Sequence, residues 1–126
     1  MKKVTMLMPI NFNNGQPIPT ETRQQLLNEI AEAFGGYTIQ QNVTGTYRMS
    51  SGDFCTEEST PVVVCVEENK LDDLRDEAGR IAKVLAQECL YFEVSSAEVD
   101  FIAPKAAPAI DEFIGHGGPL NFVLAA

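Results

Sequence analysis

The chain has 126 residues, of which 44% are hydrophobic and 21% are charged, and its formal net charge is −9 at pH 7. A length of this order suits one domain, which can bury about two thirds of the surface of its unfolded chain. The negative charge repels phosphate backbones and anionic lipid, and the nine Lys and Arg residues are scattered. No apolar run approaches the length of a membrane span. We therefore expect neither a nucleic-acid partner nor a membrane partner.

The first third of the chain predicts a strand followed by a helix. Residues 3–10 alternate, and they carry apolar side chains on both faces of the expected strand, which indicates a central position in a sheet. A loop rich in turn-forming residues follows. Thr20 is the expected N-cap of an amphipathic helix, and Gly35 and Gly36 are expected to end it. Its buried side is predicted to contain Leu26, Leu27, Ile30 and Phe34.

The middle of the chain predicts one long β-hairpin. From Tyr37 to Met49 the odd positions are mostly apolar and the even positions are all polar, which is the period of a half-buried strand. Residues 50–53 supply the turn, and the return strand ends in an apolar run from Val62 to Val66. The polar row is either a binding surface or the exposed face of an outer strand. It contains Thr38, Gln40, Asn42, Thr44, Thr46 and Arg48.

A second helix and a last strand follow the hairpin. Asn69 is the expected N-cap, and Asp76 and Arg80 are spaced for an ion pair on the exposed side. Gly79 interrupts this helix, and a close contact with a neighbouring element would explain it. The expected apolar stripe comprises Leu71, Leu74, Ala78, Ile81, Ala82 and Leu85. Residues 90–94 then predict the last strand.

The element order strand, helix, strand, strand, helix, strand predicts an α+β fold of the ferredoxin-like type. In this βαββαβ arrangement one antiparallel sheet has both helices on one face, and the first and third strands are central. Those are the two strands with apolar residues on both faces. Residues 1–103 are expected to form this domain. Residues 104–126 are expected to form a C-terminal tail, whose apolar end packs on the sheet or on a partner subunit.

The three cysteines, Cys55, Cys65 and Cys89, have no metal-binding or redox spacing. An odd number of thiols cannot all pair within the chain, so we expect free cysteines and a reducing, cytoplasmic location. Cys65 lies in the apolar run and is expected to be a small core residue.

Candidate site residues are few. Tyr47, Arg48, Glu57 and Tyr91 would form a ligand-binding cluster of acid–base and anchoring groups, provided that the fold brings them together. His116, the only histidine, is either a ligand-binding residue in a flexible loop, as a general base or metal ligand, or a residue at the end of a short helix, beside the C-cap glycine Gly115. No phosphate loop, dinucleotide fingerprint or nucleophile elbow is present, and the acidic pairs lack the spacing of a calcium loop. We expect no cofactor and no metal.

Four short sequences, GGYT, GTYR, SGD and CTEE, beginning at Gly35, Gly45, Ser51 and Cys55, resemble a pattern in small bacterial domains of unknown function. The resemblance implies a ferredoxin-like domain and transfers no catalytic residue. We therefore expect a self-associating domain, most simply a homodimer, that binds a small molecule or a protein without catalysis. The alternative is a small enzyme resembling the dimeric α+β barrel monooxygenases and isomerases, with a pocket between sheet and helices.

Overall fold

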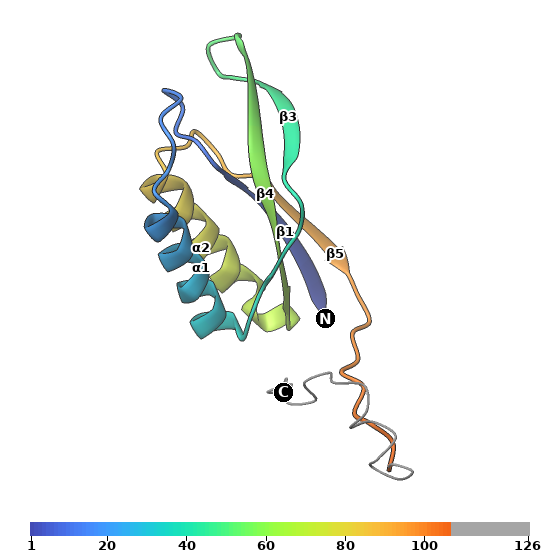
Figure 1. The fold of residues 1–126 in the computed structure, drawn as a ribbon. Helices are drawn as coiled ribbons and strands as arrows, with labels where there is room; N and C mark the ends of the chain where they lie inside the picture. Colours follow the sequence, from blue (N-terminus) through green and yellow to red (C-terminus); the bar gives the residue numbers. More distant parts are fainter. Residues whose placement is uncertain (107–126) are drawn as a thin grey trace.

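The computed structural model describes residues 1–106, and these form the ferredoxin-like α+β fold (Figure 1). One antiparallel sheet forms the first layer, and two helices on one of its faces form the second. The second strand of the βαββαβ order is divided into two short pieces. In chain order the elements are β1 (Lys2–Pro9), α1 (Thr20–Phe34), β2 (Thr38–Ile39), β3 (Val43–Arg48), β4 (Phe54–Val66), the short 3₁₀ helix η1 (Glu68–Lys70), α2 (Leu71–Val84) and β5 (Phe92–Ser96).

The two strands with apolar residues on both faces are central, as expected. The sheet order is β2-β4-β1-β5, and β3 continues the edge beside the outer part of β4. All these pairs are antiparallel, with Val4 opposite both Val64 of β4 and Val94 of β5. Each central strand therefore has a neighbour on both sides, which satisfies its backbone hydrogen bonds without water.

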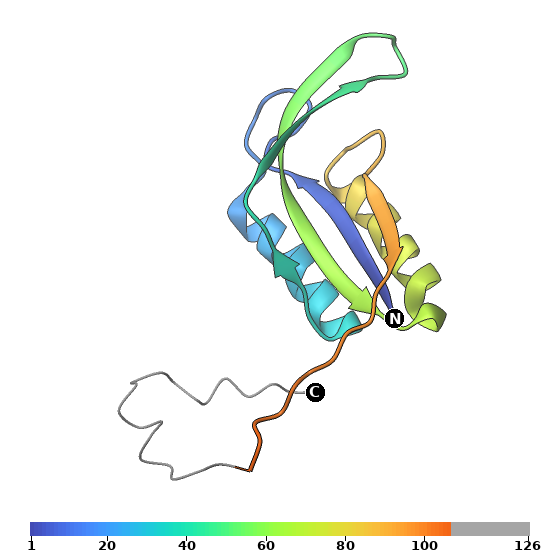
Figure 2. The ribbon, with the colours of Figure 1, turned by 90° about the vertical axis from the view of Figure 1, so that its right-hand side faces the viewer.

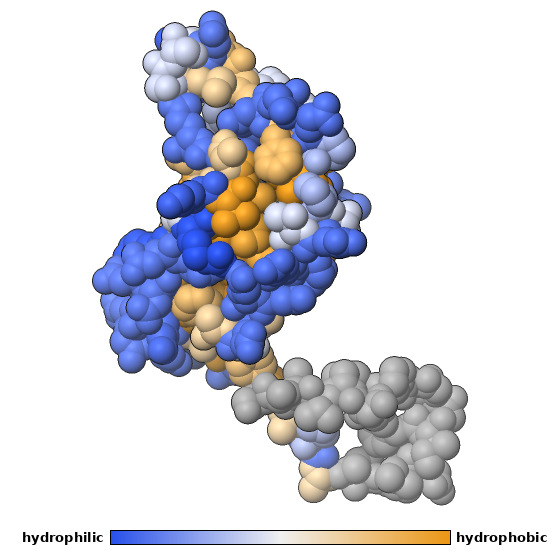
Figure 3. All heavy atoms as spheres, turned by 90° about the vertical axis from the view of Figure 1, so that its left-hand side faces the viewer, coloured by the Kyte–Doolittle hydropathy of each residue, from blue (hydrophilic) through white to orange (hydrophobic). Residues whose placement is uncertain are grey.

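The core lies between the sheet and the helices. Alternate residues of β1 and β4 face the helices, whose apolar stripes meet them, and Ile30, Leu74 and Ile81 are fully buried there. The predicted core is confirmed, with Phe34 partly buried at its margin. Figure 3 shows this side of the molecule, where mainly hydrophilic outer surfaces flank an apolar area. The buried set includes Val4, Met6, Met8, Ile18, Leu26, Leu27, Val62, Val64, Val66, Leu71, Ala78 and Leu85.

The edge strand is broken at residues 40–42, between Ile39 and Val43, and the break reverses its faces. In β2, Thr38 lies opposite Val63, whereas in β3, Thr44 lies opposite Glu58. The two registers differ by one residue, so an extra residue enters between them, as in a β-bulge. The predicted continuous polar row is therefore wrong, because its two parts lie on opposite faces of the sheet. In β3 the apolar row of Val43, Gly45 and Tyr47 lies on the face away from the helices.

Details of the helices also differ from expectation. Thr20 is the first residue of α1, whose N-cap is Pro19, and α2 begins at Leu71, two residues after Asn69. Gly79 has open space around its α-carbon, so the expected close contact is absent within the described residues. The helical conformation there is ordinary, and glycine costs stability with no packing gain.

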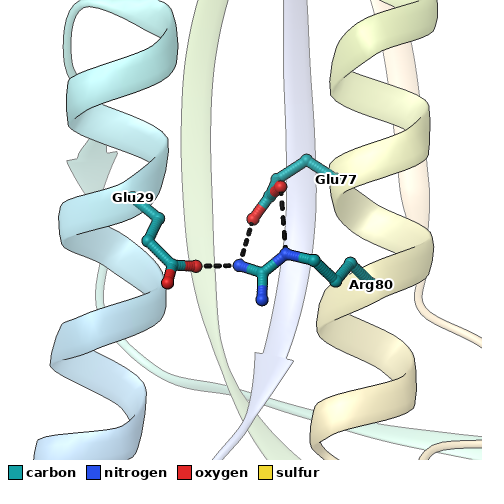
Figure 4. A network of polar contacts seen from close by, with 3 residues as sticks. All are labelled: Glu29, Glu77 and Arg80. Carbon is teal, nitrogen blue, oxygen red and sulfur yellow. Dashed lines mark hydrogen bonds and ion pairs between the residues drawn. The ribbon is translucent and has the colours of Figure 1, made fainter.

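Arg80 does not form the predicted ion pair with Asp76 and instead links α2 to α1. Arg80 forms an ion pair with Glu29 of α1 and two hydrogen bonds of 2.6 and 3.2 Å with Glu77 of α2 (Figure 4). Glu77 lies three residues before Arg80 and Asp76 lies four before it, and both spacings allow side-chain contact on a helix. Glu77 also lies toward α1, so the guanidinium reaches both carboxylates at once.

The sheet has an open face, which we define by Thr5, Leu7, Val63 and Cys65, all half-buried. Figure 2 looks onto this face, and no helix of residues 1–106 covers it. The prediction that Cys65 is a core residue is wrong, because register places it beside Lys3 on this face and not beneath the helices. All three cysteines are free, and Cys55 and Cys89 lie outside the core.

After β5 the chain leaves the sheet. The amide of Ala97 donates to the carbonyl of Met1 at 3.0 Å, and residues 97–106 then form neither strand nor helix. Phe101 and Ile102 are 63% and 78% exposed, so this segment does not pack on the sheet. The predicted tail beyond residue 106, including His116, lies outside the described residues.

Candidate ligand-binding site

A cavity of about 470 Å³ lies where the β3–β4 hairpin (residues 43–59) bends over the α2–β5 connection (residues 85–91). Figure 2 shows the hairpin reaching beyond the body of the sheet on that side. The volume falls in the range of small-molecule pockets, roughly 300–1,000 Å³. Its lining combines apolar and polar side chains from three separate segments: Leu7, Pro9 and Asn13; Thr46, Tyr47, Arg48, Met49, Cys55 and Glu57; and Gln87, Glu88, Cys89, Leu90 and Tyr91.

Tyr47 takes its position because residue 45 is glycine. A β-carbon at Gly45 would lie 2.5 Å from the Tyr47 hydroxyl oxygen and 2.8 Å from its Cζ. The ring therefore lies across the strand, in the space that any larger side chain at position 45 would occupy. The reversed face of β3 turns this ring toward the cavity, 37% exposed.

The ionisable groups of the cavity influence one another. Burial raises the pKa of the Tyr47 phenol, and the nearby Glu57, Tyr91 and Cys89 raise it further. Burial also raises the pKa of the Glu57 carboxyl group above its usual value. The phenol is therefore neutral at pH 7 and available as a hydrogen-bond donor, while Glu57 is an acceptor that has lost part of its hydration.

Two hydrogen bonds hold the walls of the cavity together. The amide of Ser50 donates to Glu88 Oε1 at 3.2 Å and joins the hairpin turn to the α2–β5 connection. Asn13 Nδ2 donates to the carbonyl of Ala86 at 3.2 Å and joins the loop after β1 to the same connection. Ala86 has a φ of 52°, which lets the chain turn sharply at the end of α2. The α2–β5 connection is thus fixed from two sides.

Two consecutive hydrogen bonds at the bulge connect α1 to the start of the β3–β4 hairpin. Arg23 Nη2 of α1 donates to Thr60 Oγ1 at 2.6 Å, and Thr60 Oγ1 donates to Asn42 Oδ1 at 2.7 Å. Arg23 Nε is buried and has no partner within residues 1–106, and burial lowers the pKa of this guanidinium. These two hydrogen bonds link α1 to β4 and to Asn42, the residue before β3.

Four of the five predicted site residues line one cavity, namely Tyr47, Arg48, Glu57 and Tyr91. Their role in ligand binding stays a prediction. The guanidinium of Arg48 lies 4.9 Å from the centre of the Phe54 ring, a weak cation–π contact at an exposed position. His116 lies outside the described residues. Sequence reasoning missed Leu7, Glu88 and Cys89, which no motif marks and which reach the cavity only through the bend of the hairpin.

A second, more open groove runs between α2 and β5. Its lining includes the small residues Ala78, Gly79 and Ala82. Arg75 lies beside it with its guanidinium 5.9 Å from the centre of the Phe92 ring. In the part of the chain that the structure describes, no three His, Cys, Asp or Glu side chains are grouped as metal ligands, and no helix is long and apolar enough to cross a bilayer.

Comparisons with known proteins support the fold alone. No protein-family model and no curated protein matches this chain. A phage SAM lyase solved in complex with S-methyl-5'-thioadenosine has a TM-score of 0.61 at 14% identity, over 75% of this chain and 79% of that one. The divalent cation tolerance protein Cut A1 from Thermus thermophilus has a TM-score of 0.54 at 14% identity, over 91% and 93% of the chains.

A third similar structure belongs to a DUF3240 family protein from Shewanella baltica, with a TM-score of 0.50 at 8% identity, over 82% of this chain and 97% of that one. These neighbours are small α+β proteins, and the expected resemblance to domains of unknown function is confirmed at the level of the fold. At such identities the fold does not determine the activity.

Proposed function

We propose that this protein is a self-associating domain that binds a small molecule in the cavity between the β3–β4 hairpin and the α2–β5 connection. The observation that carries the proposal is the convergence of Tyr47, Glu57 and Tyr91 on one cavity of about 470 Å³. An apolar floor with a few polar groups is the usual composition of such a site. The apolar residues exclude water, and the phenols and the carboxylate orient the ligand.

The test is a small-molecule screen by thermal shift on the full chain, followed by mapping with amide chemical shifts. S-methyl-5'-thioadenosine belongs in the screen, because a structural neighbour was solved with it. Binding should shift amides around Tyr47, Glu57 and Tyr91. Cys89→Trp, at an exposed position on the cavity wall, should block binding and leave the circular dichroism spectrum unchanged. Ligand shifts confined to the α2–β5 groove would contradict the proposal.

A second candidate is a small enzyme that uses the same cavity. It is favoured by the proximity of a neutral phenol and a partly desolvated carboxylate, whose pKa values are both raised. Glu57 would then accept a proton, and Tyr47 would donate a hydrogen bond to developing negative charge. Turnover of a bound ligand by the wild type, lost in Glu57→Gln while binding persists, would support this candidate. Binding without turnover supports the first.

Self-association through the open face and a reducing location complete the proposal. Half-buried Leu7, Val63 and Cys65 would be covered by a second copy, as in a symmetric dimer. Three free cysteines suit a compartment that keeps thiols reduced. The C-terminal tail, residues 104–126, would pack either on the sheet of its own subunit or on the partner subunit.

A further inference from the structure

The charges that line the cavity are not equally available to a ligand. The Arg48 guanidinium faces the Phe54 ring at 4.9 Å, and Glu88 Oε1 accepts a hydrogen bond from the Ser50 amide. The Glu57 carboxylate takes part in no ion pair and no side-chain hydrogen bond among residues 1–106. Within the cavity lining that the structure describes, Glu57 is therefore the carboxylate without a hydrogen bond or an ion pair to protein, and two carboxylates, Glu57 and Glu88, outnumber the single guanidinium of Arg48.

Two aromatic rings accompany this carboxylate. Tyr47 and Tyr91 line the same cavity. They lie close together, since Tyr91 is one of the groups that raise the pKa of the Tyr47 phenol. The Tyr47 phenol, whose pKa is raised, is neutral at pH 7. The faces of both aromatic rings carry negative potential. Aromatic faces beside a carboxylate attract cations that carry apolar groups, such as quaternary ammonium or sulfonium ions. The net charge of −9 adds to this preference, because it repels anionic ligands.

We propose that the cavity binds a small organic cation, an ammonium or sulfonium centre with apolar substituents. Glu57 acts as the counter-ion, and the rings of Tyr47 and Tyr91 contact the cationic centre. Met49 and Leu90 accommodate the apolar substituents. This assignment rests on the proposed function, since it names the ligand class of the same cavity. A hydrated metal ion would be a poorer ligand, because it keeps its water and gains little from aromatic faces.

The experiment compares cations with neutral molecules of the same shape, by calorimetric titration of the full chain. Choline against 3,3-dimethylbutan-1-ol, and S-adenosylmethionine against S-adenosylhomocysteine, are two pairs that differ chiefly in one positive charge. At least one cation should bind about tenfold or more tightly than its neutral counterpart. Equal or tighter binding of the neutral member in both pairs would overturn the assignment.

Glu57→Gln and Glu58→Gln form a matched pair of variants. The two carboxylates are consecutive in β4, but Glu58 pairs with Thr44 and points to the opposite face. Glu57→Gln should remove the preference for the cation, whereas Glu58→Gln should retain it, and circular dichroism should show both variants folded. If both variants lost the preference for the cation equally, the effect would come from the net charge of the protein, which would contradict the role of Glu57.

The rings are tested separately. Tyr47→Phe keeps the aromatic face and should retain the preference, whereas Tyr47→Leu should weaken cation binding severalfold more than binding of the neutral counterpart. If neutral compounds bind in the cavity without any preference for cations, this inference fails and the proposed function stands. If no compound of either kind shifts the amides around Tyr47, both fail.

Discussion

Gly45 decides where the Tyr47 ring lies, and through that ring it shapes the cavity. Its role is steric, since a β-carbon there would overlap the Tyr47 hydroxyl group and Cζ. Gly79 offers the opposite case, because no atom lies within 4 Å of the position of its missing β-carbon. The same residue type is therefore required at one position and replaceable at the other.

Gly45→Ala should displace the Tyr47 ring and weaken ligand binding about tenfold or more, while the fold stays within about 1 kcal/mol of the wild type. Chemical shifts of the Tyr47 ring protons and a ligand titration would measure both effects. Gly79→Ala is the control. It should raise the free energy of unfolding by up to about 1 kcal/mol, because alanine favours the helix, and should not change binding. Unchanged binding in Gly45→Ala would contradict the steric role of the glycine.

Glu57 is expected to lower stability at neutral pH while serving the site. Burial raises its folded-state pKa, so the folded protein holds this proton more tightly than the unfolded chain. Its contribution to stability is thus fully present below the unfolded pKa and is lost as the pH rises through the folded pKa. Glu57→Gln should therefore be more stable than the wild type at pH 7, by less than about 1 kcal/mol because the group is partly solvated.

The gain of Glu57→Gln should disappear near pH 4, where the wild-type carboxyl group is itself largely protonated. Urea titrations at the two pH values measure the difference. Glu58→Gln, at the exposed neighbouring position, should change stability little at either pH. A variant that is less stable at pH 7 than the wild type would show that Glu57 has a stabilising partner.

At the scale of elements, α1 and α2 are anchored to the sheet by their apolar stripes and to each other by Arg80. The Arg80 side chain is 44% exposed, so its pairs with Glu29 and Glu77 are partly screened by water. Most of the stability therefore comes from the buried residues beneath, and the ion pairs chiefly fix the spacing of the helices.

Arg80→Ala should lower the free energy of unfolding by about 0.5–1 kcal/mol, and the loss should shrink as salt is added. Chemical denaturation at low and high ionic strength would measure this. Lys70→Ala removes a 3.9 Å pair with Asp73, three residues further along the chain, which does not link α1 to α2. It should cost less than Arg80→Ala at low salt, and an equal cost would argue against a contribution from bridging the helices.

Sequence patterns predicted the helices and the central strands because burial imposes a strict period on them. The stripe of Leu71, Leu74 and Ile81 has few alternative interpretations. The bulge within residues 40–42 left no comparable signal, since Gln40, Gln41 and Asn42 include neither a glycine nor a proline, and it reversed the faces of β3. The candidate cluster of Tyr47, Glu57 and Tyr91 was predicted from residue type, whereas the shape of the cavity depends on the bend that this bulge introduces.

At the scale of the whole molecule, the open face of the sheet is not covered by any helix of residues 1–106. Thr5, Leu7, Val63 and Cys65 form a half-buried patch on two central strands, and both helices lie on the other side. Lys3 and Glu93 at the margins of this face supply opposite charges. A second copy related by a two-fold axis would bury the patch and bring these charges together.

The full chain should therefore form a dimer at micromolar concentration, and Val63→Lys should yield a folded monomer. Light scattering and circular dichroism would measure the two properties. Val84→Lys places the same charge on α2, at a side chain that is 44% exposed, and should remain dimeric. A chain ending at Ala103 tests whether the tail contributes. A monomeric wild type would contradict self-association.

The two parts of the long strand β4 have different neighbours, and we expect them to differ in local stability. Residues 60–66 lie in the core between β1 and the edge, whereas residues 54–59 pair mainly with β3 in the projecting hairpin. Amide hydrogens of the first part should exchange with deuterium only when the whole molecule unfolds, while those of the second exchange through local opening. A ligand in the cavity contacts the second part alone. Occupancy should therefore slow exchange around Cys55 and Glu57 well before it slows exchange at Val62 or Val64.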